Sequence, residues 1–556
     1  MSAFFDDRPK QWETEPLAKH QENIDSDQDE SEDELPPQPK PLKRLVPLTS
    51  RGFAGHLAQR QIGDLMTFIR VLTAVGDEEG RVRLLESSGG PTEPFSRIHL
   101  CFQAHTNAII DLDFSDDDHR LATASGDQTG RVIDMMTQTP ISILQHHTAS
   151  LKQVRFQPGK SNSSVLATSS RDGSVQIWDL RCSGPLVQEI APHERENALR
   201  FRRPLPKQGC AVNSLYHAHA RTSRQVQQAT AGQGDTPSRR ELPARIGDVS
   251  VTALQFLPEG QEHLLLTACE ADASIKLWDI RSIHSSRQKV PSALSATTPP
   301  SSHLNWRPFG ISSLSMNTDG SRLYALCKDN TVYAYSTAHL ILGHAPELST
   351  RNGEPPRRRH NAVTHQGLGP LYGFRHPSLH ASSFYVKCAV RPARDGRSEL
   401  LAVGSSDNCA ILFPTQERYF RDELSGAMNA VSLENSTIAT SNQHSAATAP
   451  VEPTVRRPLF RNNSTVAISA RLNDDIPIVK MGTPLVRGHE SEVGALTWTN
   501  EGKLVTAGDD YLIRCWSEGR EQAEDLRTGG EGEGRRWGCG WAEVGEDWDV
   551  PDDDED

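Results

Sequence analysis

Three histidine–aspartate pairs recur along this chain and could, by residue type alone, carry out general acid–base chemistry. A carboxylate that orients an imidazole is a common arrangement for a general base. The same pairing recurs, however, in segments that cannot share one active site, so we expect no catalytic residue here. The pairs are His105 with Asp127, His147 with Asp172, and His489 with Asp510.

These pairs are better explained as a structural hydrogen-bond relay. In such a relay the aspartate accepts a hydrogen bond from the histidine, and the histidine reaches a strand hydroxyl group and the indole N–H of a tryptophan. We expect Asp272 to play the same part in a further unit. The relay would fix the twist of a small sheet.

The relay aspartates belong to a second regular pattern, in which an acidic residue is followed six residues later by a bulky apolar residue. Short apolar runs such as "VLATSS" and "LLLTAC" precede these pairs and predict strands. The pattern occurs seven times, as Glu79 and Leu85, Asp127 and Ile133, Asp172 and Trp178, Asp272 and Trp278, Asp329 and Tyr335, Asp407 and Phe413, and Asp510 and Trp516.

This spacing is typical of the WD40 repeat, and seven repeats form one ring of four-stranded blades, a β-propeller. We therefore predict an all-β protein with a seven-bladed WD40 propeller over residues 45–517. No alternating apolar run follows Trp516. The segment 45–56 is therefore expected to supply the missing strand of the last blade and to close the ring.

The remaining segments are polar or acidic and are expected to be disordered. They comprise an acidic N-terminal tail over 1–44, an acidic C-terminal tail over 518–556, and insertions at about 183–245, 338–370 and 416–480.

Composition excludes several function classes. A net charge of −13 argues against binding bare nucleic acid or an anionic membrane through a basic surface. The start of the chain lacks the pattern of a signal peptide, and no apolar run is long enough to span a membrane, so we expect a soluble intracellular protein. The nine cysteines show no C-x-x-C pair and are expected to be small core residues, for example Cys269, Cys327, Cys409 and Cys515.

Motifs for cofactor chemistry are also absent from the sequence. We find no phosphate-binding loop, no nucleophile-elbow motif and no zinc-binding helix motif, so no cofactor and no metal are expected. His217 and His219 stand close together, but they fall within a polar insertion. We expect both to be solvated rather than to bind a metal.

The tetrapeptide Trp178-Asp179-Leu180-Arg181 recurs one unit later as Trp278-Asp279-Ile280-Arg281. A strand-end arginine at one such box is readily explained as a solvated surface residue. Two boxes in consecutive blades favour a role in docking a protein partner.

These boxes resemble the W-D-x-R boxes of WD40 substrate receptors of cullin-four RING ubiquitin ligases. The stretch "FQAHTNAIIDLDFSDDDHRLATASGDQTGRVIDM" and the first box are similar to the denticleless type of receptor. The second unit departs from that type, because Ile133-Asp134 stands where Trp-Asp is usual.

The resemblance implies a non-catalytic, nuclear specificity subunit that directs replication-licensing and related proteins to ubiquitin-dependent proteolysis. Its partners would be the large damage-specific DNA-binding protein subunit as adaptor, cullin-four, a RING subunit, and substrates displayed on the DNA sliding clamp, without direct contact to nucleic acid. A WD40 scaffold in another nuclear complex and a propeller-fold enzyme are the alternatives. Adaptor binding is assigned to Trp178, Asp179, Arg181, Trp278, Asp279 and Arg281, and the substrate-face candidates are Glu78, Arg171, Lys328 and Asp509.

Overall fold

Short strands dominate the part of the chain that a computed structural model describes. The chain divides into two units, Met1–Pro41 and Leu42–Asp556, and every described residue lies in the second. The predicted tail over 1–44 is outside the described residues. Those residues are 45–53, 70–86, 98–159, 163–187, 205–220, 249–282, 293–305, 308–342, 365–366, 368–394, 396–419, 476–528, 539–542 and 544.

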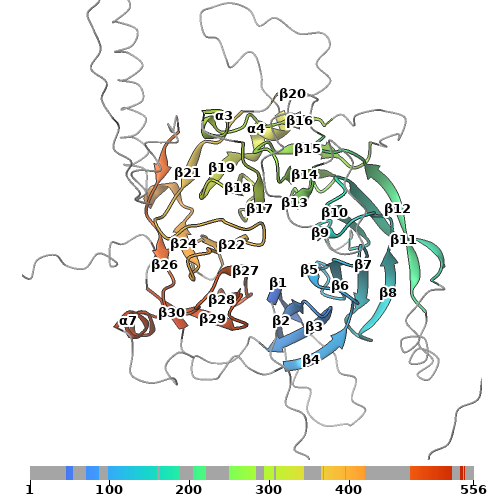
Figure 1. Ribbon diagram of the computed structural model, residues 1–556, viewed down its shortest axis with the longest axis horizontal. Coiled ribbons are helices and arrows are strands. Elements are labelled where there is room, and N and C mark those ends of the chain that lie inside the picture. The colour runs from blue at the N-terminus through green and yellow to red at the C-terminus, as the bar shows by residue number, and fades with distance from the viewer. Residues whose placement is uncertain are drawn as a thin grey trace, which may run out of the picture. The chain divides into compact units, whose positions relative to one another are not determined.

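The strands form seven four-stranded blades around a common centre (Figure 1), which confirms the predicted WD40-type propeller. Blade 1 contains β1 (Leu45–Phe53), β2 (Arg70–Asp77), β3 (Arg81–Glu86) and β4 (Ile98–Gln103), and blade 2 contains β5 (Ile109–Phe114), β6 (Arg120–Ser125), β7 (Gly130–Asp134) and β8 (Thr139–Leu144). Blade 3 contains β9 (Leu151–Phe156), β10 (Val165–Ser170), β11 (Val175–Leu186) and β12 (Lys207–Leu215). Blade 4 contains β13 (Val251–Phe256), β14 (Leu264–Cys269), β15 (Lys276–Asp279) and β16 (Ser295–Ala296).

The later blades have shorter outer strands. Blade 5 contains β17 (Ile311–Met316), β18 (Arg322–Cys327), β19 (Thr331–Ser336) and β21 (Tyr372–Phe374), and blade 6 contains β22 (Cys388–Arg391), β23 (Leu400–Val403), β24 (Ile411–Pro414) and β26 (Thr483–Pro484). Blade 7 contains β27 (Val493–Trp498), β28 (Leu504–Gly508), β29 (Ile513–Glu518) and β30 (Cys539–Trp541).

Hydrogen bonds from backbone N–H groups to side-chain oxygens join the inner strands of neighbouring blades. The inner strand of a blade has one edge without a strand partner in its own sheet, and a buried N–H group without an acceptor would be costly. These bonds run from Val154 N to Asp111 Oδ2 (2.9 Å), from Phe156 N to Asp113 Oδ2 (2.7 Å) and from Cys388 N to Ser313 Oγ (3.2 Å). Polar residues on these strands therefore act as blade-to-blade joints.

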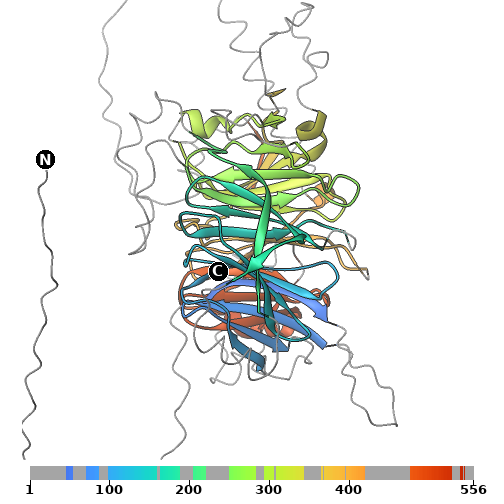
Figure 2. The ribbon, with the colours of Figure 1, turned by 90° about the vertical axis from the view of Figure 1, so that its right-hand side faces the viewer.

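The chain between several blades adds strands at the outer edges, so the predicted insertions contain ordered parts. The long strands β11 and β12 lie on the side that faces the viewer in Figure 2, and β12 also pairs in parallel with β8 of blade 2. Two further strands, β20 (His365–Gln366) and β25 (Ile478–Val479), pair in parallel with β16 and β21. The short helices are α3 (Ser301–Asn305), α4 (Thr337–Leu342) and the 3-10 helix η2 (Glu417–Tyr419).

The two ends of the propeller differ from the sequence prediction. Strand β1 is the inner strand of blade 1 and pairs with β2, so segment 45–56 does not provide the outer strand of blade 7. That strand is β30, which pairs in parallel with β29 and follows helix α7 (Arg520–Thr528). The prediction of a disordered tail over 518–556 is therefore wrong for these elements. The reason is that three buried residues suffice for this strand, which is too short to show an alternating pattern.

Aromatic packing holds β30 in place. Trp541 is buried, and its ring meets that of Trp498 edge to face at a centroid separation of 5.9 Å. The guanidinium carbon of Arg391 lies 5.4 Å from the Trp498 ring centroid and 6.0 Å from that of Trp541. Arg391 also donates hydrogen bonds to the carbonyl oxygen of Ser398. Because this cluster draws on blades 6 and 7 together, β30 stabilises the junction between them.

We expect Trp541→Ala to lower the free energy of unfolding by about 3 kcal/mol, because truncating a buried tryptophan removes apolar burial and leaves a cavity. Trp541→Phe keeps most of the bulk and should cost clearly less. Urea denaturation followed by circular dichroism measures both. Equal stability of Trp541→Ala and the wild-type chain would show that β30 does not secure blade 7.

Candidate functional site

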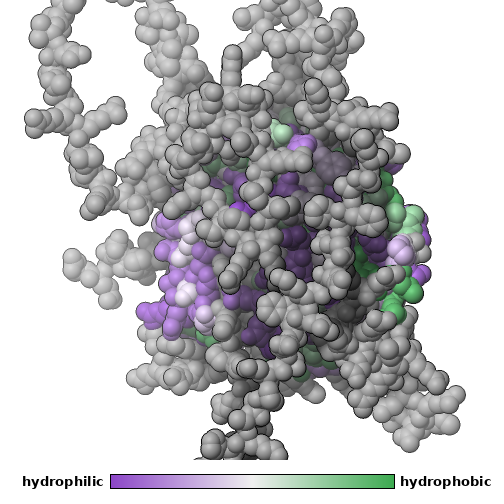
Figure 3. Space-filling model, turned by 45° about the vertical axis from the view of Figure 1, so that its right-hand side comes forward, coloured by the Kyte–Doolittle hydropathy of each residue, from purple (hydrophilic) through white to green (hydrophobic). Residues whose placement is uncertain are grey.

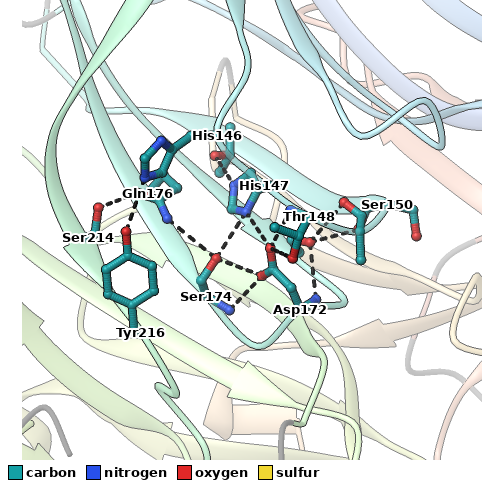
Figure 4. A network of polar contacts seen from close by, with 12 residues as sticks. His146, His147, Thr148, Ser150, Asp172, Ser174, Gln176, Ser214 and Tyr216 are labelled. Atoms are coloured by element: carbon teal, nitrogen blue, oxygen red, sulfur yellow. Dashed lines mark hydrogen bonds and ion pairs between the residues drawn. The ribbon is translucent and has the colours of Figure 1, made fainter. Parts of the chain in front are cut away.

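The hydrogen-bond relay of blade 3 passes through the buried Thr168, and Figure 4 shows its other members His147, Asp172 and Ser174. The indole Nε1–H of Trp178 donates to Thr168 Oγ1 at 2.8 Å, and Thr168 Oγ1 lies 2.7 Å from His147 Nε2. Nδ1 of the same imidazole lies 3.4 Å from Asp172 Oδ2 and 3.0 Å from Ser174 Oγ. Because the carboxylate can only accept, Nδ1 carries the proton and Nε2 accepts from the threonine.

Blades 2 and 7 hold the same histidine–aspartate pairing, although blade 2 has Ile133 in place of the tryptophan. His105 Nδ1 lies 2.9 Å from Asp127 Oδ2, and His489 Nδ1 lies 3.0 Å from Asp510 Oδ2. Burial alone would raise the pKa of Asp127, but the hydrogen bond and charge of His105 outweigh it and lower the pKa to about 2. The stabilisation from this carboxylate is thus complete above the unfolded-state pKa of about 3.9 and is lost as the pH falls through the folded-state pKa.

Blade 4 has its own relay histidine, His219, which the sequence analysis expected to be solvated. His219 is buried, its Nε2 lies 2.8 Å from Thr267 Oγ1, and the same hydroxyl accepts from Trp278 Nε1 at 2.9 Å. The prediction of a solvated residue is therefore wrong for His219. Trp278 was the signal that could have identified His219, because a relay tryptophan implies a threonine and a histidine in the same blade. The signal was missed because an insertion separates His219 from the next strand in the sequence.

The acid of blade 4 is placed differently from the acids of the other relays. Asp272 accepts from the backbone N–H of Ser274, and the described residues include no histidine within hydrogen-bond distance of it, so the relay role predicted for it is wrong. Lys276 lies nearby and donates to the carbonyl oxygen of Ala218 at 2.7 Å. Burial, together with the charge of Lys276, holds the pKa of His219 well below its usual value, so the imidazole is neutral.

The relay turns and the Trp-Asp boxes stand at opposite ends of the blade strands. In blade 3, Val165 at the start of β10 pairs with Asp179, whereas Ser169 near its end pairs with Val175. Asp172 lies in the turn beyond Ser169, and Arg181 follows Asp179. The propeller therefore presents the relay turns on one face and the boxes on the other.

Each box arginine is held by the aspartate of its own box. Arg181 Nε donates to Asp179 Oδ1 at 2.9 Å and Nη2 donates to Oδ2 at 2.8 Å, and Arg281 pairs with Asp279 in the same way at 3.0 and 2.9 Å. The side chains of Arg181 and Arg281 are nevertheless 69% and 66% exposed. The hydrogen bonds from the guanidinium groups lower the pKa of both carboxyl groups. The bidentate pairing fixes each arginine in one orientation and leaves its Nη1 without a partner in the described part of the chain.

Hydrogen bonds from within blade 3 hold both boxes in fixed positions. The backbone N–H of Leu180 in the first box donates to Ser164 O at 2.8 Å. Asn213 of β12 donates from Nδ2 to the carbonyl oxygens of Ile280 and Ser282 at 3.0 and 2.8 Å, so an outer strand of blade 3 secures the second box. Sequence reasoning missed Asn213, because nothing in its neighbourhood marks it as a contact of a box residue far along the chain.

The four substrate-face candidates, Glu78, Arg171, Lys328 and Asp509, all lie in turns directly after the second strand of a blade and share the relay face. Lys328 is engaged within the chain, since its Nζ donates to the carbonyl oxygen of Ser382 and lies 4.3 Å from the Phe384 ring centroid. Asp509 donates its backbone N–H to Glu492 O at 2.9 Å. The same blade 7 turn exposes Tyr511, which has a left-handed backbone with φ of 61°.

The structure describes Cys269, Cys327 and Cys409 as buried and Cys515 as partly buried, and burial raises the pKa of Cys269 to about 12. The described residues include no group of three or more histidine, cysteine, aspartate or glutamate side chains that could hold a metal ion. No helix in the described ranges has the length and apolar character needed to cross a membrane.

Comparison with known families agrees with this geometry. The family model "WD domain, G-beta repeat" matches residues 96–134, 138–179 and 482–517. With seven blades and the relay, these matches define the class: the chain is a WD40-repeat propeller protein.

Curated relatives narrow the class. The chain is 27% identical over 479 residues to Cell division cycle protein cdt2 of Schizosaccharomyces pombe, covering 84% of this chain and 71% of that protein. It is 30% identical to the Denticleless protein homolog of Gallus gallus and 29% identical to that of Homo sapiens. These alignments cover 62% and 61% of this chain but only 39% and 38% of the relatives. The chain is thus similar to WD40 proteins of the denticleless and Cdt2 type.

We expect His219→Ala to lower the free energy of unfolding by about 2 kcal/mol, because the buried hydroxyl of Thr267 loses its acceptor. His217→Asn is the matched control, since asparagine tolerates the left-handed backbone of His217 (φ of 55°). The control should unfold like the wild-type chain in thermal denaturation. Equal losses in the two variants would contradict a relay role for His219.

Proposed function

We propose that this chain is the non-catalytic substrate-recognition subunit of a cullin-four RING ubiquitin ligase, acting in the nucleus. The observation that carries the proposal is the pair of ordered boxes on one face of adjacent blades, each presenting an exposed arginine locked by its own aspartate. The resemblance of these boxes to receptor motifs and the denticleless-type relatives support it. The partner on this face would be the large damage-specific DNA-binding protein subunit, which serves as the ligase adaptor.

The box geometry suits a docking anchor. An arginine already held in a bidentate pair loses little conformational entropy on binding, so more of its interaction energy appears as affinity. The Nη1 groups of the exposed Arg181 and Arg281 can donate to carbonyl or carboxylate oxygens of the adaptor. The aspartates thus act as positioning residues, and Trp178 and Trp278 secure them to the buried relays.

Arg181→Ala combined with Arg281→Ala should reduce adaptor binding by at least thirtyfold, because truncating an interface anchor costs about 2 kcal/mol or more. The thermal midpoint should stay near that of the wild-type chain, since exposed arginines add little to stability. Isothermal titration with purified adaptor and co-purification of cullin-four from cells measure the effect.

Arg520→Ala is the matched control, because Arg520 is a 75% exposed arginine on helix α7 in a surface pair with Glu524. A double box variant that binds like the wild-type chain would overturn the proposal and favour the alternative, a WD40 scaffold in another nuclear complex. A double box variant that unfolds would show that the two arginines are structural.

The relay face would then read substrates, which we propose are replication-licensing and related proteins displayed on the DNA sliding clamp. The resemblance implies a basic residue in the recognised segment, and Glu78 and Asp509 are acids in the relay-face turns of blades 1 and 7. Blade 7 adds the exposed Tyr511 in a backbone conformation that tyrosine rarely adopts. A strained, exposed aromatic residue beside an acid favours a recognition role over a packing role.

Glu78→Gln combined with Asp509→Asn should slow ubiquitination of such a substrate severalfold in a reconstituted ligase, because the basic segment loses its complementary charges. Adaptor affinity should stay unchanged, since both residues lie on the opposite face. Glu521→Gln, an exposed acid on helix α7, serves as the control. Unchanged ubiquitination in the double variant would place substrate recognition elsewhere.

A further inference from the structure

Blade 2 carries a third member of the box series, in which methionine replaces arginine. In the strand pairing, Leu121 faces Ile133 as Leu166 faces Trp178 and Leu265 faces Trp278. Ile133-Asp134-Met135-Met136 therefore occupies in blade 2 the position of a Trp-Asp-x-Arg box.

Met136 consequently stands at the position of the box arginines. Met136 is 51% exposed, although most large apolar side chains of the propeller are buried. Figure 3, in which Met136 is not marked, shows hydrophobic surface mainly at the right-hand edge of the view, with smaller hydrophobic areas elsewhere. The equivalent positions in blades 5, 6 and 7 are Ala338, Gln416 and Gly519, so among these blades only 2, 3 and 4 place a methionine or an arginine there.

The turn that presents Met136 is rigid. Asp134 Oδ2 accepts from the backbone N–H of Thr137 at 3.1 Å and from its hydroxyl at 2.5 Å. The backbone N–H of Gln138 donates to Asp134 O at 2.7 Å, and that of Met135 donates to His119 O at 2.9 Å. Met135 is buried and anchors the turn. Asp134 thus holds the turn, whereas Asp179 and Asp279 each hold an arginine side chain. The exposed Met136 therefore stands on an ordered backbone.

Blade 2 is also tied to the first box. Arg120 of β6 pairs with Asp134 in the strand register and donates from Nη1 to Ser163 O at 2.8 Å. The neighbouring Ser164 accepts from Leu180 N at 2.8 Å. One short segment therefore connects the Met136 turn with the Arg181 box, and the two positions keep a fixed spacing.

We propose that Met136 is an apolar anchor of the same docking surface as Arg181 and Arg281, and that it enters an apolar socket of the ligase adaptor. This inference rests on the proposed function. The partner is the same adaptor, because Met136 occupies the box position of the blade next to the one that carries Arg181. Methionine is flexible and polarisable, which suits it to an apolar socket, and interface cores are enriched in methionine and arginine.

Methionine oxidation tests the inference on the unmodified full chain. Hydrogen peroxide should convert exposed Met136 to the sulfoxide in the free protein and at least fivefold more slowly in the adaptor complex, as measured by peptide mass spectrometry. Met135, the buried neighbour, should react slowly in both states and serves as the internal control. Oxidation of Met136 at the same rate in both states would overturn the inference.

Affinity measurements supply the second test. Met136→Glu should weaken adaptor binding at least tenfold, because a carboxylate would be buried in an apolar socket, and Met136→Ala should weaken it severalfold. Leu368→Glu, in the segment between β20 and β21 where the leucine is 41% exposed, is the matched control and should bind like the wild-type chain. If Met136→Glu folds and binds within twofold of wild type while the double arginine variant does not bind, the inference fails and the proposed function stands. If the double arginine variant binds normally, the proposed function itself fails.

Discussion

A single buried threonine hydroxyl in each relay blade connects the two faces of this propeller. In blade 3, Thr168 accepts from Trp178 and donates to His147, which in turn donates to the turn that holds Asp172. Trp178 is followed directly by Asp179, so the relay begins beside a box and ends in a turn on the opposite face. Buried networks of this kind are valuable only when every member is satisfied, because the low local dielectric penalises an unpaired group. The relay therefore positions both surfaces at once.

The blades differ in how completely they satisfy this requirement. Blades 3 and 7 join a tryptophan, a threonine, a histidine and an aspartate, whereas blade 2 has Ile133 in place of the indole. Blade 4 keeps Trp278 and His219, but a lysine rather than an aspartate lies beside the imidazole. Hydrogen bonds from the inner strands also join blade 2 to blade 3 and blade 5 to blade 6. The ring is thus stabilised both within its blades and between them.

The two faces differ in the way they are prepared for partners. On the box face, Arg181 and Arg281 are exposed but already oriented, and Asn213 and the Ser163–Ser164 segment hold neighbouring blades in register. Side chains that are already oriented on rigid elements favour binding of one partner that does not change. On the relay face, charges of both signs lie on the turns of several blades, and the exposed Tyr511 shares the blade 7 turn with Asp509, an arrangement open to more varied ligands. This difference supports the proposal that one face holds a fixed subunit and the other recognises substrates.

Much of the propeller could be read from the sequence, because each blade repeats one spacing between its turn acid and its strand-end apolar residue. The pairs of His105, His147 and His489 with their acids, and the likeness of the two boxes, are local patterns of this kind. Other features depend on segments far apart in the chain. The short β30 has no pattern of its own and is a strand only because Trp541 packs against Trp498. His219 is a relay residue only because Thr267 of β14, far along the chain, lies beside it, and Met136 matches the box positions only through the register of β6 and β7. Local spacing thus determined the repeat and its residues, whereas tertiary packing decided which residues share an edge, a buried hydroxyl or a face, because those relations arise only when distant strands are brought together.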